Sequence, residues 1–113
     1  MKTIELAETV GTPVRGIEVN RVRREKHEIS PAEIELICST RVLAAIPEDR
    51  YVRKSVADVN PVVLNSPYSP AAIEFRRLAA HLVGARFAYL LGDRLKWFLG
   101  FGRGVRVKVR LRP

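Results

Sequence analysis

Polar side chains lie where two predicted strands end. Asn20 closes a β-branched run at residues 14–19, and the loop Pro47-Glu48-Asp49 follows the apolar segment RVLAAIP. In an open α/β sheet, ligands bind outside the carboxyl ends of the strands, which is where these residues lie. Asn and Asp also commonly cap turns, so a purely structural role for Asn20 and Asp49 is the alternative.

Other patterns of catalytic or metal-binding residues are absent from the 113-residue sequence. It has no G-x-x-x-x-G-K-[ST] motif, which holds phosphates by its backbone and its lysine. Cys38 has no second cysteine for a disulfide and no Cys or His at metal spacing, while His27 and His81 are isolated. There is also no protease triad and no paired carboxylate site. We therefore predict neither catalytic residues nor a metal site.

Positive charge is concentrated at the C-terminus. Residues 86–113 hold eight of the 20 Lys and Arg residues and one of the 12 acidic residues, whereas residues 1–85 are nearly neutral. A basic segment attached to a neutral body favours an anionic partner, either lipid headgroups or nucleic acid. The alternative is a solvated basic end that only increases solubility.

Aromatic and aliphatic residues within this basic segment follow helical spacing over FAYLLGDRLKWFLGF, residues 87–101. At 100° per residue they fill an apolar arc of about 200° with cations nearby, which is typical of a helix lying in a membrane interface. The predicted membrane-binding residues are Phe87, Leu90, Leu91, Arg94, Leu95, Trp97, Phe98, Leu99 and Phe101. The alternatives are a core helix packed on another part of the domain and a dimer seam.

Beyond this helix, residues 104–112 alternate strictly between apolar and basic side chains, the period of a strand with one cationic face. The predicted basic tail comprises Arg103, Arg106, Lys108, Arg110 and Arg112. Such cations suit an anionic bilayer or the phosphates of nucleic acid. The aromatic residues lie in the helix rather than among these cations, so nucleic acid is the less favoured partner.

The elements that position all these residues alternate between helix and strand. We predict helices at 3–10, 31–38, 50–58 and 70–83, strands at 14–19 and 41–47, and a short extended piece at 61–64. This order is typical of an α/β fold with a mostly parallel sheet. Two strands cannot cover their own faces, so we expect the chain to form part of a larger α/β domain.

Two Ser-Pro pairs mark the clearest helix starts. Ser30-Pro31 with Glu33 forms a capping-box pattern, and Ser69-Pro70 opens the longest predicted helix. The side chains of this last helix that recur at core spacing, and so predict one buried face, are Phe75, Leu78, Ala79 and Leu82.

The segment of residues 1–84 resembles a known family through three stretches in order. They read KTIELAETVGTPVRGIEVNRV, RVLAAIPEDRYVRKS and NPVVLNSPYSPAAIEFRRLAAHLVG. Together they resemble the C-terminal half of a MinD/ParA-type P-loop ATPase, in particular the archaeal MinD-like branch. The resemblance implies a doubly wound, mostly parallel sheet and ATP with Mg²⁺ at a Gly-rich loop. It also implies dimerisation and membrane attachment through a C-terminal amphipathic helix.

The same resemblance implies roles for the residues at the strand ends. Asn20 is implied to read the adenine edge, and Arg21, Pro47, Glu48 and Asp49 are implied to border the base and ribose. The half that carries the Gly-rich loop is missing, so we expect no ATP hydrolysis and no bound ATP or Mg²⁺ for this chain alone. The expected protein partner is a separately encoded N-terminal ATPase half or a homodimer mate.

Two features depart from the family's pattern. Glu18 lies in a strand that is usually apolar in the family, with Arg15 on the opposite face, and Val59 lies where the family often has Gly. The predicted division is an ATPase-like part at 1–84, an amphipathic membrane-targeting helix at 85–103 and a basic tail at 104–113.

These observations together predict a MinD-like regulator of cell division or positioning that binds an anionic membrane surface. The sequence has no run of about 18 apolar residues and no signal-peptide pattern. We therefore expect a cytoplasmic protein that is peripheral at the inner face of the cell membrane. The alternatives are a nucleic-acid-binding ParA-like scaffold with a basic tail, and a truncated remnant without function.

Overall fold

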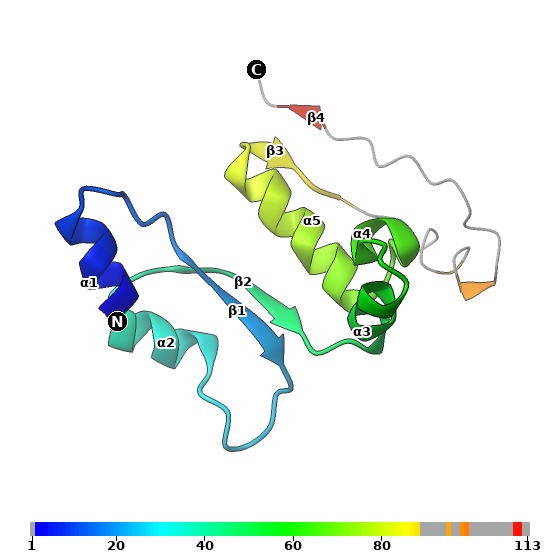
Figure 1. The fold of residues 1–113 in the computed structure, drawn as a ribbon, viewed down its shortest axis with the longest axis horizontal. Helices are drawn as coiled ribbons and strands as arrows, with labels where there is room; N and C mark the ends of the chain where they lie inside the picture. The colour runs from blue at the N-terminus through cyan, green and yellow to red at the C-terminus, as the bar shows by residue number, and fades with distance from the viewer. Residues whose placement is uncertain (1, 89–94, 96–97, 100–109, 112–113) are drawn as a thin grey trace.

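The computed structural model describes residues 2–88, 95, 98–99 and 110–111 and shows an α/β arrangement (Figure 1). Its elements in chain order are α1 (Lys2–Thr9), β1 (Ile17–Val22), α2 (Pro31–Cys38), β2 (Val42–Pro47), α3 (Arg50–Ala57), α4 (Val62–Asn65), α5 (Pro70–Leu82), β3 (Ala85–Arg86) and β4 (Arg110–Leu111). β1 and β2 are parallel neighbours. The predicted α/β class with a parallel sheet is confirmed.

The parallel sheet is irregular at both ends of β1. Its register shifts between Ile17 and Glu18 and again between Val19 and Val22, where β1 holds one residue more than β2. Within the described part of the chain, neither outer edge of this sheet pairs with a further strand. Parallel sheets are normally covered on both faces, and here α5 packs on the sheet at β2.

The core lies between β2 and α5, which pass close to each other in Figure 1. Ala44, Ile46 and Ala71 are buried, and they pack against the partly buried Val52, Phe75 and Leu78. The small side chain of Ala71 at the start of α5 lets the helix approach the strand closely. Ile46 is fully buried and is the largest of these three buried side chains.

The predicted buried face of α5 is correct only in part. Phe75 and Leu78 contact the core, but Ala79 is exposed and the Leu82 side chain is 45% exposed. The residues of α5 that are buried instead are Ala71, Ala72, Ile73 and Ala80.

Two other predicted segments need correction. Residues 61–64 are not extended, because Pro61 starts the short helix α4 and its carbonyl accepts the N–H groups of Leu64 and Asn65. The range predicted as a membrane-targeting helix, 85–103, begins with the strand β3, which pairs antiparallel with β4. Residues 87 and 88 are not helical either, so a helix in this segment cannot begin at residue 87 as predicted.

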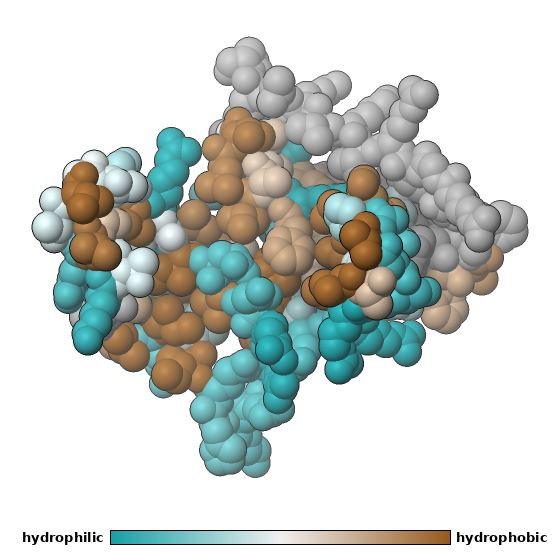
Figure 2. All heavy atoms as spheres, in the orientation of Figure 1, coloured by the Kyte–Doolittle hydropathy of each residue, from teal (hydrophilic) through white to brown (hydrophobic). Residues whose placement is uncertain are grey.

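Helices α1 and α2 differ from the other long helices because none of their residues is buried. Leu6 is 63% exposed and Leu36 is 81% exposed. Figure 2 shows apolar side chains of this part of the molecule at the surface. Local signals still form both helices. The capping box at Ser30 and Glu33 is present as predicted, and α1 is followed by Gly11 in the left-handed conformation.

Candidate functional site

A pocket of about 420 Å³ opens at the carboxyl ends of β1 and β2. The structure brings together around it all five residues predicted at the strand ends, although they come from two segments more than 25 residues apart. The full lining comprises Asn20, Arg21, Pro47, Glu48, Asp49, Val52, Arg53, Val56 and Phe75. One side-chain amide, an apolar wall and charges of both signs therefore surround one hollow.

Asn20 and Arg21 occupy the bulge near the end of β1. Arg21 has φ of 59°, in the left-handed region that L-residues usually avoid, and its backbone N–H donates to Oδ1 of Asn20 over 2.9 Å. Bulges of this kind are frequent next to functional sites, where they redirect a side chain. Here the bulge places both residues in the pocket lining.

Glu48 joins the ends of the two strands. Its backbone N–H donates to the carbonyl of Val22 over 3.0 Å, extending the ladder past β2. Its carboxylate accepts from Nε of Arg23 and, over 3.4 Å, from Nη2 of Arg21. The hydrogen bond from Arg23 is the largest cause that lowers the pKa of Glu48, with the Arg21 hydrogen bond and the two positive charges adding to it.

Asp49 is buried and holds two helices. Oδ1 accepts the N–H of Tyr51 over 2.9 Å, which caps α3, and Oδ2 accepts the N–H of Ala71 over 3.1 Å at the first turn of α5. This is the structural role that the sequence left open as an alternative. Asp49 therefore shapes the pocket wall through the two helices that it anchors.

Sequence reasoning missed four residues of the lining. Val52 and Val56 are four residues apart on α3 and Phe75 comes from α5, so together they form the apolar wall, with Arg53 at its border. The i, i+4 spacing of the two valines was a usable signal. Phe75 was predicted only as a core residue, and it serves both the core and the pocket.

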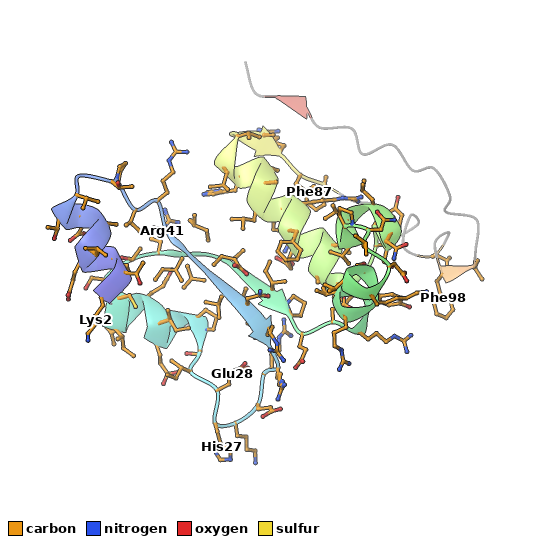
Figure 3. All side chains as sticks on the ribbon, viewed as in Figure 1. Lys2, His27, Glu28, Arg41, Phe87 and Phe98 are labelled. Atoms are coloured by element: carbon orange, nitrogen blue, oxygen red, sulfur yellow. The ribbon has the colours of Figure 1, made fainter. Side chains whose placement is uncertain are left out.

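A second, more open hollow adjoins the first and is lined by Arg21, Arg23, Glu25, His27 and Glu28. Both oxygens of the Glu28 carboxylate accept the N–H of Arg23 over 3.0 Å, and Oε2 also accepts the N–H of Arg24 over 2.6 Å. The bond from the Arg23 backbone is the largest cause that lowers the pKa of Glu28. Figure 3 shows His27 at the outer end of the loop between β1 and α2, while the Glu28 side chain lies inside the loop. In the described residues, no group of His, Cys, Asp and Glu could hold a metal ion.

Several parts of the predicted C-terminal sites lie outside the described residues. These are Leu90, Leu91, Arg94, Trp97 and Phe101 of the helix, and Arg103, Arg106, Lys108 and Arg112 of the basic tail. The Leu99 N–H donates to the Leu95 carbonyl over 3.0 Å, the spacing of an α-helical bond. None of the helices in the described ranges is long and apolar enough to span a bilayer.

The first pocket suits the binding of a flat ring with a polar edge. Its apolar wall offers a surface for a ring face, and the Asn20 amide offers a donor and an acceptor on one side chain. Nothing in its lining forms a phosphate cradle, because the 113 residues hold no P-loop motif.

Comparisons with known proteins indicate which proteins this chain is similar to. No protein-family model matches the chain. It is 36% identical over 99 residues to an uncharacterized ATP-binding protein of Methanocaldococcus jannaschii, matching 88% of this chain and 38% of that protein. A second uncharacterized ATP-binding protein of the same organism is 36% identical over 80 residues, or 71% of this chain and 30% of its own length.

Two solved structures are also similar. The cell division ATPase MinD of Pyrococcus furiosus superposes with a TM-score of 0.68 at 30% identity, over 72% of this chain and 34% of MinD. The chain is MinD-like. The septum site-determining protein MinD of Pyrococcus horikoshii, determined in complex with Mg-ADP, gives the same TM-score at 28% identity, over 72% of this chain and 33% of that protein. This MinD-like chain thus spans between three and four tenths of the length of its relatives.

Proposed function

We propose that this chain supplies the base and ribose side of the ATP site of a MinD-like ATPase. The observation that carries the proposal is the convergence of Asn20, Arg21 and the 47–49 loop on one pocket at the carboxyl ends of two parallel strands. Ligands of open α/β sheets bind at this edge. The residues fit a purine and its ribose but not the triphosphate or Mg²⁺, for which the sequence has no P-loop.

Titration of the ¹⁵N-labelled chain with adenosine tests the base site. We expect chemical-shift changes confined to residues around the pocket, and we expect Asn20→Ala to remove them because the ring edge loses its only side-chain amide partner. Asn60→Ala is the matched control, since Asn60 is exposed and does not line the pocket. Shifts that persist in Asn20→Ala, or that spread over the whole surface, would contradict the proposal.

The proposed protein partner is a part of the MinD-like fold that carries the P-loop, either encoded separately or contributed by another copy. Two observations support it: the unpaired edges of the β1–β2 sheet in the described residues, and the uncovered apolar residues of α1 and α2. A strand edge next to an apolar face is a surface that a neighbouring strand and helix cover in α/β proteins.

Mixing this chain with the P-loop portion of a Methanocaldococcus jannaschii relative tests the partner. We expect a 1:1 complex that hydrolyses ATP, while neither part hydrolyses it alone. Leu36→Lys places a charge on the exposed side of α2 and is expected to weaken the complex. Leu64→Lys is the matched control, because Leu64 is similarly exposed on α4, at the opposite side of the molecule. No complex, or equal weakening by both changes, speaks against this interface.

We further propose that the C-terminal segment binds an anionic membrane surface at the inner face of the cell membrane, in a role in cell division or positioning. The supporting observation is that three residues of the predicted apolar face, Leu95, Phe98 and Leu99, are 59%, 81% and 59% exposed, so their side chains are not sealed in the core. Figure 3 shows Phe98 at the outside of the molecule. Exposed aromatic and aliphatic groups within a basic segment are typical of interfacial binding.

Flotation with vesicles containing anionic lipid tests this second proposal. We expect the chain to float, and we expect Phe98→Glu to abolish flotation whereas Leu64→Glu leaves it unchanged. A chain that stays in the pellet fraction contradicts membrane binding. Salt-dependent retention of duplex DNA on a filter, in the absence of vesicle binding, would instead favour the nucleic-acid alternative.

A further inference from the structure

Three charged side chains connect the ends of β1 and β2 beside the pocket. The Glu48 carboxylate accepts from Nε and Nη2 of Arg23 and from Nη2 of Arg21. The Glu48 side chain is only 25% exposed, although both arginines are more than half exposed. A network of several charges fixes geometry better than an isolated surface pair does.

The same Arg21 determines how the Asn20 side chain is held. Its backbone is in the left-handed conformation, and from there its N–H donates to Oδ1 of Asn20. The Nδ2 group of Asn20 has no hydrogen bond to another residue of the described ranges. The amide thus has one defined orientation: Oδ1 accepts from the Arg21 N–H and keeps a second lone pair, and that lone pair and the Nδ2 donor are left for a ligand.

These contacts form a chain from Glu48 through Arg21 to Asn20. We propose that Glu48 is a positioning residue: by holding the Arg21 side chain, it keeps the β1 bulge in the conformation that fixes the Asn20 amide. The identity of the ligand rests on the proposed function, whereas the link from Glu48 to Asn20 does not depend on it. Other roles for Glu48 are a surface ion pair without effect on Asn20, and a direct contact with the ligand.

A fixed amide has a consequence for base selectivity. An amide held in one orientation presents its donor and acceptor in a fixed order, so it distinguishes a purine with an amino group at C6 from one with a carbonyl there. An amide that can rotate by 180° offers the reverse order and pairs with either. Glu48 therefore determines discrimination between adenosine and inosine, two nucleosides that share the same ribose and almost the same shape.

The first experiment tests the link from Glu48 to Asn20 in the absence of a ligand. In the free, ¹⁵N-labelled chain we expect one sharp pair of Asn20 side-chain amide signals, which broaden or shift in Glu48→Gln. Glu25→Gln is the matched control, because Glu25 reaches Arg23 only at 4.0 Å and does not line the first pocket. Unchanged Asn20 side-chain signals in Glu48→Gln overturn the proposal, whether or not any nucleoside binds.

The second experiment measures selectivity and separates the possible roles of Glu48. We expect the ratio of adenosine to inosine affinity to fall at least about fivefold in Glu48→Gln, the smallest effect expected of one mispaired hydrogen bond. Arg21→Gln is expected to lower the ratio similarly, and the double variant to fall no further, because both changes break one chain of contacts. Equal loss of affinity for both nucleosides, or additive effects, would overturn the positioning role.

The two experiments also distinguish failure of this inference from failure of the proposed function. If the unchanged chain binds neither nucleoside, the proposed base site is wrong, and the Asn20 signals still decide the link. If it binds adenosine and Glu48→Gln alters neither the signals nor the ratio, only the inference is wrong. Well-dispersed backbone amide signals in each variant confirm that the chain remains folded.

Discussion

The two ends of this molecule, with α1 and α2 at one and α3, α4 and α5 at the other in Figure 1, differ in how their helices are packed. On the side of α3, α4 and α5, buried side chains such as Ile46 and Ala71 form a core against β2. On the side of α1 and α2 no helical residue is buried, and Leu36 is 81% exposed. The first side is held by buried packing, whereas α2 on the second side has the Ser30 capping box and a hydrogen bond from the Val42 N–H to the Glu35 carboxylate.

This difference separates the part of the fold that has a packed core from the part whose helices have no buried residue. Short isolated helices are marginal in water, and most helical stability in proteins comes from packing an apolar face. α1 and α2 have apolar residues with no cover in the described part of the chain, next to a strand edge without a partner. The pocket lies on the packed side, so its walls are defined by the chain itself.

The sharpest test of the comparison is a pair of truncations to alanine, one on each side. Ile46→Ala removes a fully buried side chain and is expected to lower the free energy of unfolding by about 3 kcal/mol. Leu36→Ala removes an exposed side chain and is expected to change it by less than about 0.5 kcal/mol. Urea denaturation followed by circular dichroism measures both. Similar losses in the two variants would show that the open side is packed after all.

Asp49 gives the next largest expected effect, because one buried carboxylate anchors two helices on the packed side. Asp49→Asn keeps the size but removes the charge and one of the two acceptor oxygens, which is expected to cost about 2 kcal/mol. Asp58→Asn is the matched control: Asp58 is exposed, and its carboxylate accepts one hydrogen bond from the Asn65 amide in the described part of the chain, so a change below about 0.5 kcal/mol is expected. The denaturant midpoints of the two variants measure this difference in stability. Equal midpoints would show that Asp49 does not anchor the two helices.

The fold could be predicted where a signal is local in sequence. Ser30 with Glu33 and Ser69 with Pro70 start their helices as predicted, because capping involves neighbours along the chain. The segment at 61–64 was predicted wrongly, since its β-branched residues favour a strand while Pro61 starts a single helical turn. Propensity is a weak guide in a segment this short.

The candidate site was predictable in its position but not in its shape. That Asn20 and the 47–49 loop meet follows from two parallel strands, which end at the same edge of a sheet. The bulge at Arg21 depends on the register between strands that are distant in sequence, so no local pattern reveals it. The wall formed by Val52 and Phe75 depends on how two helices pack.

Val59 departs from the pattern of the resembled family, and its backbone conformation explains why Gly suits this position. It lies where the resembled family often has Gly, its φ is 53°, and it is 92% exposed. Val59→Gly relieves a left-handed β-branched residue without losing packing, and we expect a gain of about 1 kcal/mol. The same change at Val56, within helix α3, is expected to lower stability by about 0.5 kcal/mol. Thermal unfolding of both variants decides: a loss at both positions would mean that Val59 is not strained.

The smallest expected effect is the pH response of the open side, where Glu33 closes the capping box of α2. Its carboxylate accepts from Oγ and from the backbone N–H of Ser30, and the Oγ hydrogen bond is the largest cause that lowers the pKa of Glu33. A lowered folded pKa means that the stabilisation is fully present above the ordinary value of 4.5 and is lost as the pH falls below it.

Acid is therefore expected to loosen the start of α2 before it affects the apolar core cluster of Ala44, Ile46 and Ala71, whose own side chains do not titrate. The Ser30 amide signal, followed by NMR from pH 6 to pH 3, checks this order. Glu33→Gln keeps a carbonyl oxygen for the cap and has no proton to gain, so its Ser30 signal is expected to be independent of pH. If the Ser30 signal titrates equally in both proteins, the pH response comes from another group, and protonation of Glu33 does not loosen α2.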